Sequence, residues 1–176
     1  GTNTVGMLRL WEASSANGLN LKLFTDGLYN RSVEKENNAE HISRILYPND
    51  TGPDGKSLRL KQQYFFSSAS LQDMVRSFVS KYGTDFSQFP KYNVVQLNDT
   101  HPVVAIPELM RILVDEYRVS WDDAWSIVQQ TFAYTNHTIM AEALEKWTID
   151  IFQGLLPRIY QIVEEINRRF CQKISA

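Results

Sequence analysis

The sequence has little cysteine, no large excess of charge and no long hydrophobic run. Cys171 is the only cysteine among 176 residues, so an intrachain disulfide is impossible and a reducing compartment is the expected location. With 18 basic and 20 acidic residues, the net charge of -2 provides no field that would attract nucleic acid or an anionic membrane. No stretch approaches the roughly 20 apolar residues of a spanning helix, and no export signal is visible. We therefore expect a cytoplasmic protein without nucleic-acid or membrane partners.

Several catalytic signatures are missing as well. The sequence contains no G-x-S-x-G nucleophile elbow and no glycine-rich phosphate loop. Its three histidines are too widely separated for a zinc site made of neighbouring ligands, so no metal is expected. Glycoside hydrolysis needs two facing carboxylates, and Asp99, Glu142 and Glu145 are candidates whose separation the sequence does not give. Acidic residues on helices usually face solvent, which is the simpler interpretation of Glu142 and Glu145.

The residues that are present predict a packed α/β domain with more helix than strand. A content of 43% hydrophobic and 12% aromatic residues is sufficient for a core. Apolar patterning predicts strands at residues 7–11, in the run LRLKQQYFF from Leu58 and at 94–97, and a further apolar segment ends near Tyr134. Helical spacing predicts helices over residues 26–46, 71–79, from Thr100 onwards, 120–128 and 157–170. Thr100 can cap the third of these helices, since Pro102 is tolerated in its first turn, and Pro107 should bend or restart it. Two prolines and two glycines within residues 48–55 predict a loop there.

Two short polar runs are the strongest candidates for chemistry. QLNDTHP at 96–102 and AYTNHT at 133–138 each follow or interrupt an apolar pattern, where a strand or helix ends. Carboxyl ends of strands are where α/β folds place ligands. One cleft can therefore receive both runs, whose hydroxyl, amide, carboxylate and imidazole groups suit a polyhydroxy ligand such as a sugar. Asp99 can orient His101 or His137 by accepting an N–H. From the residue types alone, helix capping and a packed imidazole explain these side chains equally well.

Nine runs together resemble the glycogen and maltodextrin phosphorylase family in order and spacing, over nearly the whole chain. They are RILYPND, LRLKQQYF, SLQDMVR, QLNDTHP, AIPELMRILVDE, AYTNHT, EALEKW, LLPR and EINRRF. The resemblance implies that residues 1–176 are part of the Rossmann-like amino-terminal domain of a two-domain, GT-B type glycosyltransferase. It also implies that the parent cuts the terminal α-1,4 bond of a glucan with inorganic phosphate, using pyridoxal phosphate, to give glucose 1-phosphate.

The resemblance also implies roles for individual residues. The family's counterpart of His137 binds the 6-hydroxyl side of the transferred glucosyl unit, and its backbone carbonyl helps to stabilise the positive charge that develops on the sugar ring. His137 is therefore the expected catalytic residue. The residues that match the lining of the pocket beside that glucosyl unit are Asp99, His101, Thr138, Glu145 and Arg59.

Two segments match the family's gate and dimer contact. Residues 47–55 resemble the loop over the active site, where Asn49 and Asp50 match substrate-binding positions but Thr51 replaces the usual asparagine. Residues 26–46 correspond to the projecting helix that packs against its twin in a homodimer, which accounts for the polar middle of this expected helix. The regulated members carry two arginines after LQD, whereas this chain has Arg76 followed by Ser77, so AMP control is not expected and a bacterial type fits.

The cofactor lysine of the family has no counterpart here, so no cofactor-binding residue is expected between Gly1 and Ala176. The chain is then a fragment that is inactive alone. A carbohydrate-binding module without a reaction and a dimerisation fragment are the alternative interpretations.

Overall fold

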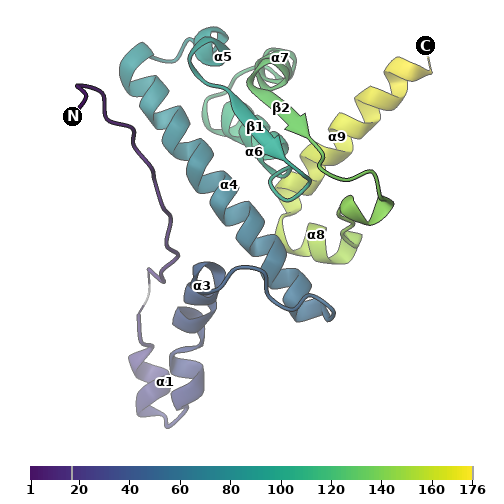
Figure 1. Cartoon of the computed structure of the whole chain (residues 1–176). Helices are drawn as coiled ribbons and strands as arrows, with labels where there is room; N and C mark the ends of the chain where they lie inside the picture. Colours follow the sequence, from purple (N-terminus) through teal and green to yellow (C-terminus); the bar gives the residue numbers. More distant parts are fainter. Residues whose placement is uncertain (17, 176) are drawn as a thin grey trace. The chain divides into compact units, whose positions relative to one another are not determined.

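The structure is a computed structural model that describes residues 1–16 and 18–175, except for the side chain of residue 142. It divides the chain into two compact units, Gly1–Gln62 and Gln63–Ala176 (Figure 1). Helices dominate the described part of the chain, and a small parallel sheet belongs to the second unit. This arrangement agrees with the expected helix-rich α/β class.

The first unit consists of an extended segment followed by short helices. These are α1 (Leu21–Thr25), α2 (Tyr29–Ser32), α3 (Glu34–Arg44) and the beginning of α4 (Pro53–Tyr82). The strand predicted at residues 7–11 is wrong, because that segment has no β structure. Met7, Leu8 and Leu10 are instead largely exposed. A strand requires a neighbour for its backbone groups, and the apolar alternation alone does not supply one.

The single helix predicted over residues 26–46 is replaced by shorter pieces. Gly27 takes a left-handed φ of 77° after α1, and α2 and α3 are separated at Val33. The Ser32 hydroxyl donates to the Tyr29 carbonyl oxygen at 2.6 Å, so it competes for a backbone acceptor of the helix. α3 has no buried residue, which agrees with the expectation of a solvated helix in this region.

Helix α4 replaces the strand predicted from Leu58. Its 30 residues run from the first unit into the second and include the whole of LRLKQQYFF. The alternation of Leu58 and Leu60 was too short to distinguish a strand from a helix. Pro53 is tolerated in the first turn, where its missing N–H has no intrahelical partner. The predicted loop therefore ends at Gly52, and the last three residues of the segment 47–55 are helical.

The second unit is built around two parallel strands, β1 (Val95–Asn98) and β2 (Phe132–Thr135), with the register running from Val95↔Phe132 to Asn98↔Thr135. β1 corresponds to the strand predicted at residues 94–97, and β2 to the apolar segment that ends near Tyr134. The remaining elements are η1 (Phe86–Gln88), α5 (Phe89–Tyr92), α6 (Ala105–Arg111), the π-helical turn η2 (Ile112–Glu116), α7 (Trp121–Thr131), η3 (Ala141–Ala143), α8 (Ile149–Leu155) and α9 (Pro157–Ile174). Chain segments between the strands include α6 and α7, as in a βαβ crossover.

The predicted ends of these helices are partly correct. Ser120 caps α7 by accepting a hydrogen bond from the Asp123 backbone N–H at 3.2 Å, and Pro157 lies in the first turn of α9. The helix predicted from Thr100 begins later, at Ala105, after hydrogen-bonded turns. Pro107 lies in the first turn of α6 and neither bends nor restarts it.

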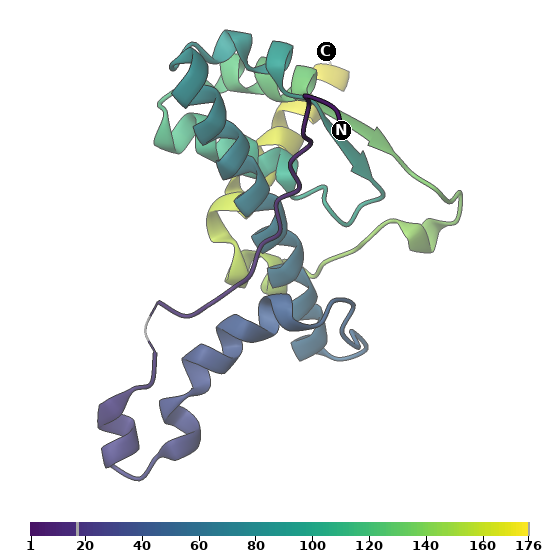
Figure 2. The same ribbon diagram turned by 60° about the vertical axis from the view of Figure 1, so that its left-hand side comes forward.

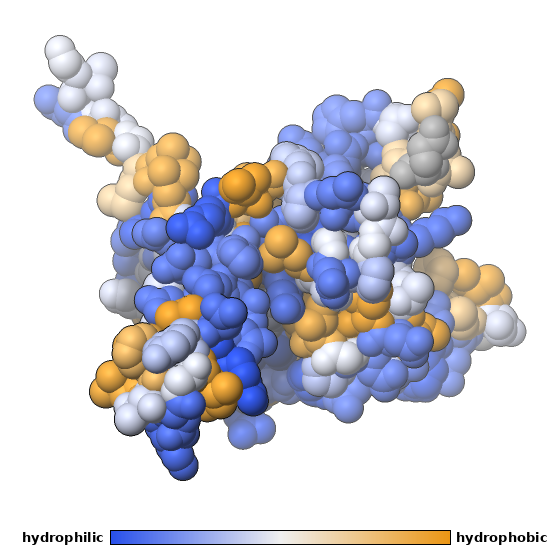
Figure 3. Space-filling view, turned by 90° about the horizontal axis from the view of Figure 1, so that it is seen from below, coloured by the Kyte–Doolittle hydropathy of each residue, from blue (hydrophilic) through white to orange (hydrophobic). Residues whose placement is uncertain are grey.

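The core of the second unit lies between the sheet and its helices. Leu97 of β1 is buried with side chains of α4, α6, α7 and α9, whereas Gln96 and Asn98 on the opposite face are exposed. Figure 2 shows the α-helices of this unit gathered on one side of the strands. Large apolar side chains also reach the surface, as the orange areas of Figure 3 show. The sheet therefore has one covered face and carries exposed polar side chains on the other.

A buried carboxylate joins α4 to α6. Glu108 is fully buried and accepts hydrogen bonds from the Tyr64 hydroxyl at 3.0 Å and the Ser68 hydroxyl at 2.7 Å. Arg111 donates to both of its oxygens at 2.8 Å. Burial, and then the Glu108 charge, raise the pKa of Tyr64 above its usual range. The network satisfies the buried charge and fixes α4 against α6 within the second unit.

Candidate functional site

The parallel pairing of β1 with β2 places the two polar runs side by side. Asn98 lies opposite Thr135 in the register, and the next backbone N–H, that of Asp99, donates to the Thr135 carbonyl oxygen at 2.8 Å. The segments that follow the two strands leave the sheet at this edge. The carboxyl ends of the two strands thus meet, and the two polar runs lie at one edge of the sheet.

Asp99 and His137 form the closest contact between the two runs. One Asp99 carboxylate oxygen accepts a hydrogen bond from the His137 backbone N–H at 2.8 Å and lies 3.1 Å from His137 Nδ1. Hydrogen bonds from the His137 backbone and ring lower the pKa of Asp99 below its usual value. With a proton on Nδ1, the neutral ring presents Nε2 as an acceptor. The His137 side chain is 57% exposed, so a ligand can reach it.

Backbone strain accompanies this contact. Asp99 has a φ of 58°, in the left-handed region that few residues other than glycine adopt. Aspartate and asparagine tolerate this region better than most residues do. Such strained positions are frequent at functional sites, where the surrounding structure holds them.

A second group of side chains surrounds Glu145. Gln63 of α4 donates to both Glu145 carboxylate oxygens, at 2.9 and 3.0 Å. His101 Nδ1 lies 3.5 Å from the same carboxylate. The Thr100 hydroxyl accepts a hydrogen bond from the Glu145 backbone N–H at 3.1 Å and donates to the Ala143 carbonyl oxygen at 3.2 Å. Thr100, expected to cap a helix, therefore holds the segment that carries Glu145.

Contacts hold four of the predicted site residues in two places. Asp99 contacts His137 between the two polar runs, and His101 lies beside Glu145, which Gln63 also binds. Thr138 follows His137, and its hydroxyl accepts a hydrogen bond from the Met140 backbone N–H at 3.2 Å, within the same loop. The Glu142 side chain lies outside the described residues.

Gln63 was not predicted to take part in the site. A helical interpretation of LRLKQQYFF places Gln63 three residues after the buried Leu60, on the same helix face. An amide on that face requires a hydrogen-bond partner, and this requirement is the feature of the sequence that could have indicated a role for Gln63 in the site.

Asn49, Asp50 and Arg59 form a separate group in the first unit. The Arg59 guanidinium donates to the Asp50 carboxylate, and this hydrogen bond lowers the pKa of Asp50. The Asn49 side-chain oxygen accepts two hydrogen bonds from Thr51, one from the backbone N–H at 3.0 Å and one from the hydroxyl at 2.8 Å. A side chain at Gly55 would place its Cβ 1.8 Å from the Asn49 carbonyl oxygen. The loop therefore packs directly on the first turn of α4.

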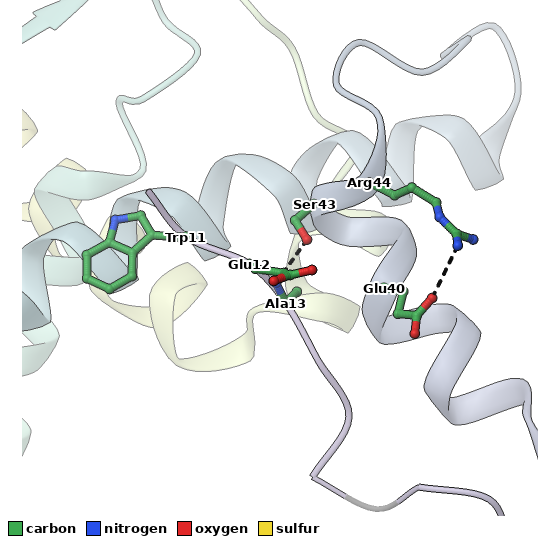
Figure 4. Close-up of a pocket in the computed structure, with 6 residues that line it drawn as sticks. All are labelled: Trp11, Glu12, Ala13, Glu40, Ser43 and Arg44. Carbon is green, nitrogen blue, oxygen red and sulfur yellow. Dashed lines mark hydrogen bonds and ion pairs between the residues drawn. The ribbon is translucent and has the colours of Figure 1, made fainter. Parts of the chain in front are cut away.

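Two cavities lie apart from these groups. In the first unit, a cavity of about 580 Å³ is lined by Trp11, Glu12, Ala13, Glu40, Ser43 and Arg44 (Figure 4). In the second unit, a groove of about 520 Å³ runs between α7 and α9, where the Arg169 guanidinium lies 5.0 Å from the Trp121 ring. Neither cavity is lined by a predicted site residue.

Other classes of site find no support in the described part of the chain. No group of three or more histidine, cysteine, aspartate or glutamate side chains could hold a metal ion there. Among the same residues, no helix has the length and apolar character needed to cross a membrane.

The whole chain, residues 1–176, matches the family model described as carbohydrate phosphorylase. It is 51% identical to the muscle form of glycogen phosphorylase from Ovis aries and 52% identical to the muscle form from Homo sapiens. Identity to the liver form from Homo sapiens is 51%. These alignments cover 99% of this chain, but only 22% of each muscle enzyme and 21% of the liver enzyme. The chain therefore spans about a fifth of the length of these curated relatives.

Proposed function

The chain belongs to the carbohydrate phosphorylase family, and from this membership we propose that its parent protein cleaves the terminal α-1,4 bond of a glucan with inorganic phosphate. The product is glucose 1-phosphate. Relatives named glycogen phosphorylase, 51% and 52% identical over nearly all of this chain, support the proposal. The observation that carries it is the contact between Asp99 and His137 at the carboxyl ends of two parallel strands, where an α/β fold binds its ligand.

His137 is the residue to which we assign direct contact with the transferred glucosyl unit. Its exposed ring, oriented by Asp99, offers Nε2 to a sugar hydroxyl. Its backbone carbonyl is proposed to face the sugar ring as the glycosidic bond breaks. A fixed carbonyl dipole stabilises an oxocarbenium-like transition state because it requires no reorganisation when the charge develops.

The remaining predicted residues are proposed to bind the sugar rather than to react with it. Asp99, His101, Thr138 and Glu145 offer carboxylate, imidazole and hydroxyl groups to sugar hydroxyls. Glu145 is held by Gln63, so its oxygens have a defined orientation. Arg59, Asn49 and Asp50 are assigned to substrate binding from the gate segment 47–55 and the helix that follows it.

Pyridoxal phosphate is the proposed cofactor of the parent, and its phosphate group supplies acid–base chemistry when bound. None of the three groups of site residues in this chain includes a lysine, so they do not fit the attachment of this cofactor. We assign its binding to other parts of the parent. The isolated chain is accordingly proposed to be inactive, and the single cysteine favours a cytoplasmic location.

The proposal is tested by measuring glucose 1-phosphate released from maltoheptaose and inorganic phosphate by the full-length parent. His137→Ala should lower the rate by about a hundredfold or more, as removal of a transition-state contact does in other enzymes. Gln130→Ala, which changes an exposed side chain of α7, serves as the control and should retain activity. A parent without phosphorolysis would favour a carbohydrate-binding module instead.

Homodimer formation through residues 26–46 is a second proposal. α3 has no buried residue, which supports a role for this segment at a contact between copies. Sedimentation velocity of the parent should show a dimer, and a lysine in place of Ile42 should weaken it. A monomeric parent would reject the assignment.

A further inference from the structure

One loop of the second unit is held at both ends by two consecutive residues. Asp99 binds the beginning of the loop through the His137 backbone N–H, and Thr100 binds its end through Ala143 and Glu145. Among the described residues between these points, the hydrogen bonds are local, such as that from the Met140 backbone N–H to the Thr138 hydroxyl at 3.2 Å. Ile139 is fully exposed at the middle of the loop. The position of the loop therefore depends strongly on the turn after β1.

The Thr100 hydroxyl uses both of its hydrogen-bonding functions on this loop. Its proton goes to the Ala143 carbonyl oxygen at 3.2 Å, and its oxygen accepts the Glu145 backbone N–H at 3.1 Å. The Glu145 carboxylate then meets Gln63 and lies 3.5 Å from His101. Because the side chain of Glu145 is only 12% exposed, a displacement of its backbone would break these contacts.

We infer that Thr100 is a positioning residue that sets the geometry of residues 137–145 and thereby the affinity of the site for the sugar. The inference rests on the proposed function, since it assigns Thr100 to the same site. Thr100 acts through Glu145 and makes no contact with the reacting atoms in this scheme. His137, at the other end of the loop, remains held by Asp99 when the Thr100 hydroxyl is removed.

The separate anchoring of the two ends predicts a specific kinetic effect. Loss of the Thr100 hydroxyl should weaken sugar binding in the ground state and the transition state alike, which raises KM and changes kcat little. In the cofactor-loaded parent, Thr100→Val should raise the KM for maltoheptaose by about tenfold and change kcat by less than about threefold. Thr100→Ser retains the hydroxyl and should restore KM to within about twofold of the parent value.

Thr131→Val is the matched control. It removes a buried hydroxyl that donates to the Ile127 carbonyl oxygen at 2.8 Å within α7, so any general loss of packing would appear there too. An unchanged KM in Thr100→Val, an equal rise in Thr131→Val, or failure of Thr100→Ser to restore KM would each overturn the inference. A parent without phosphorolysis would instead reject the proposed function.

Amide hydrogen exchange provides a second measurement in case Thr100→Val does not fold. In the unmodified parent, the Glu145 amide should exchange more slowly than the Lys146 amide, because it donates to the Thr100 hydroxyl. In Thr100→Ser this protection should remain. Rapid exchange at Glu145 in the unmodified parent would overturn the inference without any variant.

Discussion

Asp99 concentrates three constraints at one residue: a left-handed backbone, a hydrogen bond to the His137 backbone and a contact with the His137 ring. These hydrogen bonds favour the ionised carboxylate and lower its pKa below the usual 3.8. A depressed pKa in the folded state contributes stability above pH 3.8 that is lost as the pH falls through the lower folded value. The loop at His137 should therefore loosen only in acid.

An NMR titration of the chain tests this expectation. The His137 amide resonance should shift with a midpoint below 3.8, before acid unfolding. Asn tolerates the left-handed region, so Asp99→Asn should keep the turn but abolish this titration. A midpoint at or above 3.8 would contradict the expected direction of the shift.

Glu108 is the residue on which the contact between α4 and α6 depends most. Its carboxylate is fully buried and paired with Arg111, Tyr64 and Ser68. Removing one partner of a buried ion pair leaves the other uncompensated, so Glu108→Gln should cost about 3 kcal/mol in the free energy of unfolding. Urea denaturation measures the change.

Glu116→Gln is the natural comparison for Glu108→Gln. Glu116 also pairs with Arg111, at 2.9 Å, but its side chain is 47% exposed. Solvent screens such a pair, so the substitution should cost less than about 1 kcal/mol. Similar losses in the two variants would mean that burial does not set the strength of this network.

Individual contacts of the site were predictable only in part. Asp99 stands in a polar run that follows a predicted strand, and His137 in one that follows an apolar segment, so the parallel topology explains their proximity. Gln63 and Glu145 are 82 residues apart, and their hydrogen bonds leave no periodic pattern in the sequence. Thr100 was interpreted as a helix cap because a threonine before a proline fits that role locally.

At the scale of elements, the loop before α4 depends on one glycine of that helix. A Cβ at Gly55 would lie 1.8 Å from the Asn49 backbone oxygen, a distance that forces the loop or the helix to move. Gly→Ala inside a helix normally stabilises a protein by about 0.5–1 kcal/mol. Here the clash should outweigh that gain, so Gly55→Ala should lower the melting temperature.

Gly154→Ala in α8 controls for the helix effect itself. Apart from the adjacent residues and the neighbouring backbone of the helix, no described atom lies within 4 Å of the Cβ that this substitution would add, and its φ is not in the left-handed region. It should leave the melting temperature unchanged or raise it. If Gly55→Ala behaved in the same way, the close packing of the loop on α4 would not matter for stability.

Elements were predicted correctly where the local pattern agreed with the tertiary partner. β1 and β2 are short apolar runs that end in polar residues, and each finds the other as its neighbour. Residues 7–11 show a similar pattern but pair with no strand in the described part of the chain. In α4, good helix formers and a proline at the first position outweighed a short apolar alternation.

At the scale of the whole molecule, the physical pattern predicted the helix-rich α/β class, whereas the family resemblance supplied the identity of the fold and the proposed reaction. Composition and periodicity describe a core and its covering helices, and many functions share such a core. The match over residues 1–176 shows the family to which the chain belongs, which composition and periodicity do not show.

The surface of the chain predicts that it associates with itself. Leu8 is 83% exposed, Ile139 fully exposed and Phe170 61% exposed, and these are three of many large apolar side chains at the surface. Exposed apolar side chains that lie together form contact surfaces, and a net charge of only -2 provides little repulsion between copies. Sedimentation velocity of the isolated chain should therefore show an average mass that rises with concentration.

The salt dependence of this association identifies its cause. Sulfate strengthens apolar burial, so it should increase the association, whereas ion pairs between copies would weaken as salt screens them. Phe170→Glu should reduce the association because it places a charge beside the apolar groove between α7 and α9. Gln88→Glu, at an exposed position of η1 that does not line the groove, adds the same single negative charge and should reduce it less. A monomer at all concentrations, or association that sulfate abolishes, would show that the exposed apolar side chains do not drive contacts between copies.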